Sequence, residues 1–243
     1  MARSTLKTIA ALLLLLAMIS SNAMAESPGK KKAIRVLLVG GGASHDFDRW
    51  YKQEDVQTLR KGGLATVEYT SDPSTILAKL KDIDVLYLSN NQPIADEATR
   101  KAIFAFVDAG NGLVLAHPAL WYNWADWPEY NQKLVGGGSK GHDKYGPFEV
   151  TITQKHPVTK GVPTSFKLDD ELYYFKPDAA GTPIEVLATA KAETSDKVFP
   201  SIFIVKYPKG RIVGIALGHD AKSHTIEPYQ TILRNAVEWA AGH

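Results

Sequence analysis

The chain has 243 residues, with 28 basic and 26 acidic side chains and no cysteine. The lack of cysteine excludes disulfide bonds and thiol catalysis. The near-balanced charge, without a long basic run, gives no electrostatic reason to expect binding to nucleic acid or to an anionic membrane surface. A chain of this length can bury a substantial core as a single domain.

Residues 1–25 have the pattern of a secretory signal peptide. Arg3 and Lys7 precede an apolar run that ends at Ile19, and residues 23–25 form an Ala-x-Ala cleavage site. A membrane span needs about 20 apolar residues, and no later segment approaches that length. We therefore expect an exported protein, periplasmic or secreted, with no membrane association after cleavage. Cleavage removes two basic residues from 28 and leaves 26 of each sign.

The first half of the expected mature chain alternates short apolar runs with amphipathic segments, which is typical of a parallel sheet with intervening helices. A flexible leader is expected at residues 26–33. Strands are predicted at residues 34–39, 64–69, 84–88 and 113–116. Helices are predicted at residues 49–61, 74–80 and 96–108, and glycines follow the first and the last of them.

The second half has a different pattern, because Pro and Gly rather than long helices separate its apolar runs. These runs predict strands at residues 148–153, 172–175, 184–190 and 201–207, added antiparallel at one side of the sheet. A tight turn at residues 208–210 should fold residues 211–217 back against 201–207. Apolar residues at helical spacing predict a last helix at 229–240. We therefore expect a single α/β domain over residues 34–243.

Three histidines each follow a predicted strand: His45, His117 and His219. If these strands are parallel, all three imidazoles emerge at the carboxyl edge of the sheet, where open α/β sheets bind ligands. The small residues before His45 let a ligand approach the backbone. The same region has neither a dinucleotide-binding glycine pattern nor a Walker pattern. The alternative is that each histidine is a hydrogen-bonding loop residue.

Other polar groups that could join such a site lie in two loops. His142 lies in a glycine-rich loop, and Asp169, Asp170 and Glu171 precede an aromatic run. One of these carboxylates can serve as a general acid or base if burial raises its pKa, whereas a solvated acidic turn is the alternative. No H-E-x-x-H motif or similar ligand pair is present. A divalent metal ion such as zinc could nevertheless be held by histidines from separate loops, namely His45, His117, His142 and His219.

Three tryptophans and two tyrosines lie within residues 121–130, directly after His117. Flat aromatic faces beside polar groups suit sugar rings, so Trp121 and Trp124 are candidate contacts for a saccharide. Tryptophans in such a segment can equally anchor a core with their N–H groups satisfied. We expect one or two of these residues to be buried and the others to line a cleft.

Five short segments carry a resemblance that covers residues 34–240. They are GLVLAH (112–117), WPEY (127–130) with LVGG (134–137), HPVTKG (156–161), DELY (170–173) and ALGH (216–219). No single segment is specific, but their order and spacing together resemble the trehalose-utilisation (ThuA-like) family. The resemblance implies a flavodoxin-like, class I glutamine amidotransferase-like three-layer sandwich, with a mostly parallel sheet and antiparallel additions in the C-terminal half.

In that fold a nucleophile elbow follows a central strand. By resemblance this position is His117, and the histidine of the amidotransferase triad corresponds to His219. Because the chain has no cysteine, glutamine hydrolysis by that mechanism is not available. The resemblance therefore implies a scaffold reused in sugar metabolism, for trehalose and related disaccharides through 3-keto-glycosides. Analogy of fold does not itself establish the reaction.

We therefore expect a carbohydrate-active enzyme that cleaves or isomerises 3-keto-glycosides. A ketone at C3 acidifies the neighbouring C–H, so a base can start elimination at C2 while an acid assists the departing oxygen. His117 and His219 are assigned as base and acid, with Glu171 as their partner. Substrate binding is assigned to a further set of residues: His45, His142, Trp121, Trp124 and Asp170.

Two other functions are open. The chain can be a non-catalytic sugar-binding module, in which the aromatic residues stack on a saccharide and the histidines supply hydrogen bonds. It can also be a metal-dependent hydrolase of a substrate other than sugar. The oligomeric state is open as well, because an amphipathic helix packs equally well on its own sheet or on a second copy of the chain.

Overall fold

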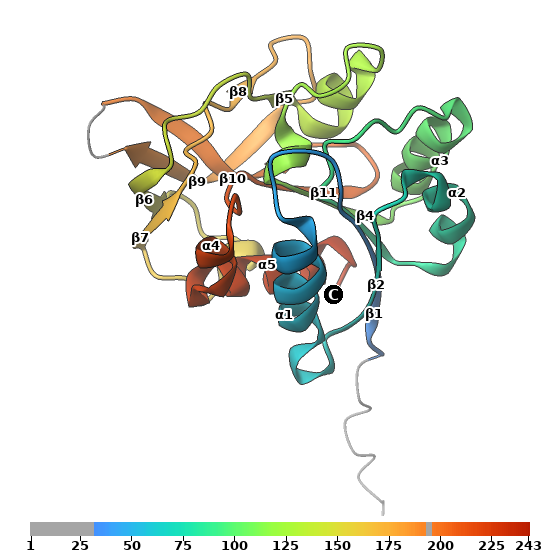
Figure 1. Ribbon diagram of the computed structural model, residues 1–243, viewed down its shortest axis with the longest axis horizontal. Helices are drawn as coiled ribbons and strands as arrows, with labels where there is room; N and C mark the ends of the chain where they lie inside the picture. The colour runs from blue at the N-terminus through green and yellow to red at the C-terminus, as the bar shows by residue number, and fades with distance from the viewer. Residues whose placement is uncertain (1–31, 193–195) are drawn as a thin grey trace, which may run out of the picture. The chain divides into compact units, whose positions relative to one another are not determined.

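Residues 32–192 and 196–243 are described here from a computed structural model. In this part of the chain, nine strands form one sheet of order β2-β1-β3-β4-β11-β10-β9-β6-β7 (Figure 1). The predicted signal peptide, residues 1–25, and most of the predicted leader lie outside the described residues. Among the described helices, none is long and apolar enough to cross a membrane.

One half of the sheet is parallel. It consists of β1 (Ile34–Val39), β2 (Ala65–Thr70), β3 (Val85–Leu88), β4 (Gly112–Ala116) and β11 (Arg211–Ile215). Strands β3 and β4 are fully buried, as their uninterrupted apolar sequences predict for parallel strands covered on both faces. The four strands predicted in the first half are confirmed to within one residue at each end.

The other half of the sheet is antiparallel. It contains β10 (Val198–Val205), β9 (Ile184–Ala192), β6 (Gly146–Ile152) and β7 (Ser165–Asp170). The predicted turn at 208–210 returns the chain from β10 to β11. A mostly parallel sheet with antiparallel additions is thereby confirmed. A second, two-stranded sheet pairs β5 (Gly137–Gly138) with β8 (Lys176–Pro177).

The strand predicted at residues 172–175 is wrong. Tyr173 forms only an isolated bridge with His142, and the aromatic character of this segment reflects the burial of Leu172, Tyr173 and Phe175. The strand that pairs at this end of the sheet is β7, which the sequence analysis missed. Only Leu168 and Asp170 of β7 are buried, because an edge strand needs few apolar residues.

Helices connect the parallel strands. The region predicted as helix 49–61 begins as the π-helix η1 (Asp48–Asp55) and continues as α1 (Val56–Arg60). The other α-helices are α2 (Ile76–Lys79), α3 (Glu97–Asp108), α4 (Ala221–Thr225) and α5 (Glu227–Ala240). A second π-helix is η6 (Tyr130–Val135). Short 3-10 segments are η2 (Lys61–Gly63), η3 (Pro73–Thr75), η4 (Leu80–Asp82), η5 (His117–Leu120) and η7 (Pro157–Thr159).

The sheet separates two apolar cores. Because side chains alternate along a strand, Val36 and Leu38 of β1 face one core, and Leu37 and Val39 face the other. Helices α1 and α5 pack in the first core, and α2 and α3 in the second (Figure 1). This arrangement makes the three layers expected from the sequence and leaves the strand ends free to carry a site.

Candidate active site

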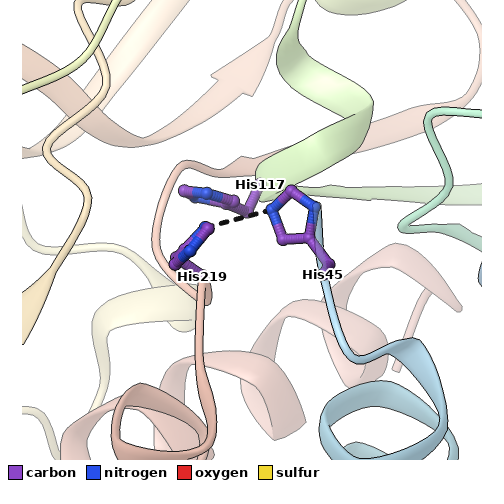
Figure 2. Close-up of side chains that lie close together, drawn as sticks. All are labelled: His45, His117 and His219. Atoms are coloured by element: carbon purple, nitrogen blue, oxygen red, sulfur yellow. Dashed lines mark hydrogen bonds between the residues drawn. The ribbon is translucent and has the colours of Figure 1, made fainter. Parts of the chain in front are cut away.

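The three histidines singled out by the sequence lie close together beyond the carboxyl ends of three strands (Figure 2). His45 follows β1, His117 follows β4, and His219 follows β11, and these strands are parallel. One ligand atom from each ring lies within 4.8 Å of the others. His219 Nδ1 and His45 Nε2 are 3.2 Å apart. The three rings therefore converge on one point at the ligand-binding edge of the sheet.

Glu171 brings a carboxylate to this histidine cluster, defined as His45, His117 and His219. Its side chain is 16% exposed and follows the end of β7. Glu171 Oε2 lies 3.0 Å from His219 Nδ1 and 3.7 Å from His117 Nε2. The cluster therefore has one negative group in direct contact with two of its three rings.

His142 lies at the edge of the site rather than in the cluster. Its Nδ1 is 2.7 Å from the carbonyl oxygen of Asp143 and 3.5 Å from Oε1 of Glu171. Its side chain is 36% exposed. His142 therefore meets the outer oxygen of Glu171, whereas the histidine cluster meets the inner one.

Backbone carbonyls orient two of the rings. His117 Nδ1 lies 2.9 Å from the Ala216 oxygen, and His45 Nδ1 lies 3.0 Å from the Ala43 oxygen. A carbonyl only accepts hydrogen bonds, so each Nδ1 carries the proton and each neutral ring presents an unprotonated Nε2. His117 is fully buried, and its Nε2 has no hydrogen-bond partner in the part of the chain that the structure describes. Such buried polar atoms are uncommon and call for a ligand or a functional role.

The electrostatic surroundings differ among the ionisable groups of the site. Burial, with the nearby charges of His117 and His219, lowers the pKa of His45 to about 3 and keeps its ring neutral. Burial alone disfavours protonated His219, but the contact with Glu171 outweighs it and raises the pKa of His219 above its usual value. For Glu171, burial is outweighed by contacts with His117 and His219, so its pKa falls well below the usual range. Glu171 is therefore ionised at neutral pH.

The loop before His45 has an unusual backbone. Gly41 and Gly42 have φ angles of +123° and +128°, and Ser44 has a φ of +68°, which is rare for a residue other than glycine. A Cβ atom at Gly42 would lie 1.7 Å from Oδ1 of Asn91. Asn91 accepts from the Ala43 N–H at 2.8 Å and donates to the Ala43 oxygen at 2.9 Å. Asn91 thus fixes the carbonyl that orients the His45 ring.

Asp170 was predicted to contact substrate, and the structure places it elsewhere. Its side chain is fully buried. Its carboxylate accepts from the backbone N–H groups of Gly218 at 2.8 Å and His219 at 3.0 Å, and also from the N–H of Glu171. The prediction is wrong because these donors occupy both oxygens of a carboxylate that no solvent reaches. Asp170 holds the backbone of His219 in place instead.

A buried ion pair lies under the same loop. His224 Nδ1 is 2.6 Å from Asp55 Oδ1, and His224 Nε2 is 3.0 Å from the Gly218 oxygen. Both ring nitrogens face acceptors, so both carry protons and the ring is charged. Tyr51 donates to the same Gly218 oxygen at 2.8 Å. The sequence analysis missed this pair, since nothing in the sequence relates residue 55 to residue 224.

Of the two tryptophans proposed as sugar contacts, only one borders the site. Trp124 is 4% exposed and packs against Trp127 and Tyr130, so its assignment to substrate binding is wrong. It belongs to the apolar core, as in the stated alternative, although its Nε1–H has no hydrogen-bond partner among the described residues. Trp121 is half-buried, and its ring centroid lies 5.9 Å from that of His142. Trp121 thus lies beside the edge of the site that His142 forms.

Three aromatic residues near the cluster were missed. The ring centroids of Trp50 and Tyr145 lie 5.7 Å and 6.2 Å from that of His219, and Tyr173 lies 3.9 Å from His117. Trp50 follows His45 at the start of a predicted helix, and this proximity in sequence was a usable signal. Tyr145 lies in a loop and had no such signal. These rings border the histidine cluster on several sides.

The sheet order and the position of the site define the class of fold. A glutamine amidotransferase from Thermotoga maritima matches with a TM-score of 0.53 and 11% identity, covering 86% of this chain and 99% of that one. A family model for trehalose utilisation (ThuA) matches residues 35–240. The chain therefore belongs to the ThuA family, which confirms the resemblance seen in the sequence.

Two solved structures are more similar. A ThuA-like protein from Parabacteroides merdae has a TM-score of 0.77 and 23% identity, covering 87% of this chain and 91% of that one. A ThuA-like protein from Bacteroides uniformis has a TM-score of 0.72 and 22% identity, covering 88% and 94%. None of the curated proteins matches the chain. At these identities the solved structures support the fold.

Proposed function

We propose that the protein is an exported carbohydrate-active enzyme that cleaves or isomerises 3-keto-glycosides or disaccharides related to trehalose. The observation that carries the proposal is the convergence of His45, His117 and His219 with Glu171 at the carboxyl edge of the sheet. Membership of the trehalose-utilisation family supports the substrate class. The pattern of residues 1–25 supports export.

The spacing of the histidine cluster favours action on a single atom. Its ring nitrogens lie within 4.8 Å of one another, whereas paired catalytic groups on either side of a sugar are about 5–9 Å apart. In a 3-keto sugar the atom that fits is the oxygen at C3. This oxygen becomes negative when the proton at C2 is removed, and it is the atom that most needs stabilisation in the transition state.

Glu171 is the proposed base. Burial raises its pKa, but its contacts with His117 and His219 outweigh burial and lower the pKa, contrary to the rise that the sequence analysis required of a base, so its carboxylate is a weak base that is present at neutral pH. It reaches toward the same point as His219 and His117. The C2 proton passes to the Glu171 carboxylate, and the C–H electron pair forms the C2=C3 double bond as negative charge moves to the C3 oxygen. Collapse of this enolate then expels the oxygen at C1, or reprotonation completes an isomerisation. This assignment replaces His117 as base and His219 as acid, because those rings face one atom together with His45.

The surroundings of the cluster suit a saccharide. Trp50 and Trp121 are half-buried and Tyr145 is exposed, so each presents part of an aromatic face near the site. His142 lies at the edge of the site and contacts the outer oxygen of Glu171, where the doubly protonated form of its ring can protonate the departing oxygen. Apolar faces with a few polar groups are the usual lining of a small-molecule site.

Product analysis tests the proposal. The purified protein is incubated separately with trehalose, 3-keto-trehalose and a 3-keto-glucoside, and products are identified by mass spectrometry and NMR. We expect turnover of the keto sugars alone, because only they have an acidified C2 proton. Equal cleavage of unoxidised trehalose would contradict the mechanism. Binding of a sugar without any product would favour the non-catalytic binding module.

A further inference from the structure

We infer that His45, His117 and His219 bind one divalent transition-metal ion, for which Zn²⁺ is the matching chemistry, at the carboxyl edge of the sheet. The inference rests on the proposed function and deepens it, since the ion lies beside the position expected for the C3 oxygen of the keto sugar. Its binding can nevertheless be measured without any sugar.

The first argument is the direction of the ring lone pairs. The Nδ1 atoms of His45 and His117 donate to the backbone carbonyls of Ala43 and Ala216, which leaves both Nε2 atoms unprotonated. Metal-binding histidines typically have this arrangement, with one nitrogen donating to a carbonyl or carboxylate and the other on the metal. Two lone pairs that point at one place attract a cation.

The second argument is the unpartnered nitrogen of His117. The residue is fully buried, and its Nε2 has no hydrogen-bond partner among the described residues. Leaving a buried polar atom without a partner destabilises the folded protein. Glu171 Oε2, at 3.7 Å, is too distant for a hydrogen bond. A metal ion would satisfy this lone pair.

The third argument is the spacing of the three nitrogens. Zinc binds imidazole nitrogen at about 2.0–2.1 Å, so two ligands of a tetrahedral site lie about 3.3 Å apart. His219 Nδ1 and His45 Nε2 are already 3.2 Å apart, and all three ligand atoms lie within 4.8 Å. The three nitrogens therefore lie near the spacing that one tetrahedral ion requires.

The fourth argument is the coordination that remains. Three histidines leave one position open, which is the pattern of catalytic rather than structural zinc sites. A ketone oxygen in that position would be polarised by the ion. Glu171 lies beside His219 and His117, and a carboxylate there lowers the cost of holding a cation at this site. The geometry thus supplies both a cation site and an adjacent base.

Metal titration tests the inference. The full protein is stripped with a chelator and dialysed. Zn²⁺ binding is then measured by calorimetry and elemental analysis, and Co²⁺ binding by its visible spectrum. We expect one equivalent of Zn²⁺ and a tetrahedral Co²⁺ spectrum. His45→Ala, His117→Ala and His219→Ala should each weaken Zn²⁺ binding at least about 100-fold, since loss even of supporting groups costs 10–100-fold.

His243→Ala is the matched control, because His243 is an exposed histidine at position 243 and is not one of the proposed ligands. It should leave affinity and stoichiometry unchanged. Circular dichroism of each metal-free variant checks folding. Should His117→Ala not fold, His45→Ala carries the test, since His45 is only partly buried. Absence of stoichiometric Zn²⁺ in the wild type would overturn the inference. Zn²⁺ binding by all three ligand variants with the affinity of the wild type would overturn it as well.

The outcomes also separate the two proposals. Stoichiometric Zn²⁺ at the three histidines, together with unchanged keto sugars, supports the metal site and contradicts the proposed reaction. Full turnover of keto sugars by a protein that binds no Zn²⁺ contradicts the metal site and supports the reaction. Turnover that is lost with chelator and restored by Zn²⁺ supports both.

Discussion

Glu171 differs from the two carboxylates before it in what its side chain meets. Asp169 is half-exposed, and its carboxylate lies 3.8 Å from the Lys222 ammonium. Asp170 is buried and accepts a hydrogen bond from the backbone N–H of Gly218. Glu171 contacts the histidine cluster. Asp169 and Asp170 point in opposite directions because they are adjacent in β7, whereas Glu171 lies just beyond the end of the strand. Three acids in a row therefore have three different roles.

Replacing this carboxylate tests its proposed role as base. Glu171→Gln keeps the shape of the side chain but cannot accept the C2 proton. We expect kcat for keto sugars to fall by about 10²–10⁴-fold with little change in KM, since general-base catalysis contributes about that much. Steady-state kinetics with 3-keto-trehalose measure both constants.

Asp169→Asn is the control, because it removes a neighbouring negative charge at a side chain that does not reach the cluster. It should keep kcat within a few-fold of the wild-type value. If Glu171→Gln retained the wild-type kcat, the base would have to be another group.

At this scale the sequence located the site residues but not their surroundings. His45, His117 and His219 were found because strand ends mark the ligand edge of an α/β sheet, and Glu171 because it is one of three consecutive acids before an aromatic run. The burial of Trp124 and the sealing of Asp170 could not be predicted, because both depend on which residues cover them in three dimensions.

The segment from β1 into η1 shapes one wall of the site. The π-helix η1 carries Trp50 near His219, Tyr51 under Gly218, and Asp55 in the buried ion pair. π-helical turns are rare and often occur at functional sites. A 3.6-residue pattern predicted a helix here, yet the wider π turn that aims these three side chains leaves no mark on such a pattern.

Asn91 supports this wall from the loop after β3. Asn91→Ala removes both hydrogen bonds to Ala43 and frees the carbonyl that orients the His45 ring. We expect Zn²⁺ affinity to fall by about 10–100-fold, the usual effect of losing a group that supports a metal ligand. Calorimetric titration with Zn²⁺ measures this.

The matched control is Asn111→Ala. Asn111 follows α3, and its side chain donates a hydrogen bond to the Phe106 oxygen rather than to a residue of the site. Its Zn²⁺ affinity should equal that of the wild type. Unchanged affinity in Asn91→Ala would show that the His45 ring does not need this support.

Strands and helices differed in how well the sequence predicted them. Uninterrupted apolar runs predicted β1, β3 and β4, because both faces of these strands are buried. The edge strand β7 was missed for the opposite reason. The aromatic run at 172–175 was taken for a strand, although it packs into the core with no more than an isolated bridge. A run of apolar residues predicts directly that the segment is buried. It predicts only indirectly that the segment pairs with another strand.

At the scale of the whole molecule, stability depends on the buried ion pair of His224 and Asp55. His224 and Asp55 are both fully buried, and Tyr87 donates to Asp55 at 2.7 Å. Burial alone lowers the pKa of His224, but the charge and hydrogen bond of Asp55 outweigh it and raise the pKa above its usual value. The folded protein therefore binds this proton more tightly than the unfolded chain does.

The free energy of unfolding should therefore fall as pH rises. The stability that this proton contributes is fully present below the unfolded pKa, about 6.5 for histidine, and is lost as pH rises through the higher folded pKa. His224→Gln should lower the free energy of unfolding by about 3–5 kcal/mol at pH 6, the usual cost of removing one partner of a buried pair. The difference should shrink toward pH 9.

Urea unfolding of the wild type and of His224→Gln at several pH values measures this difference. His243→Gln, at an exposed position, is the control and should show no pH-dependent difference. A gap between wild type and His224→Gln that stayed constant with pH would mean that His224 is not protonated in the folded state.

The contact between His219 and His45 joins distant parts of the sheet. Their strands, β11 and β1, have β4 and β3 between them, so the cluster draws on both ends of a four-strand span. A ligand bound by all three histidines links β1, β4 and β11. Separation of β1 or β11 from the sheet would break this link. By mass action, an occupied site would therefore favour the intact sheet over partly opened forms.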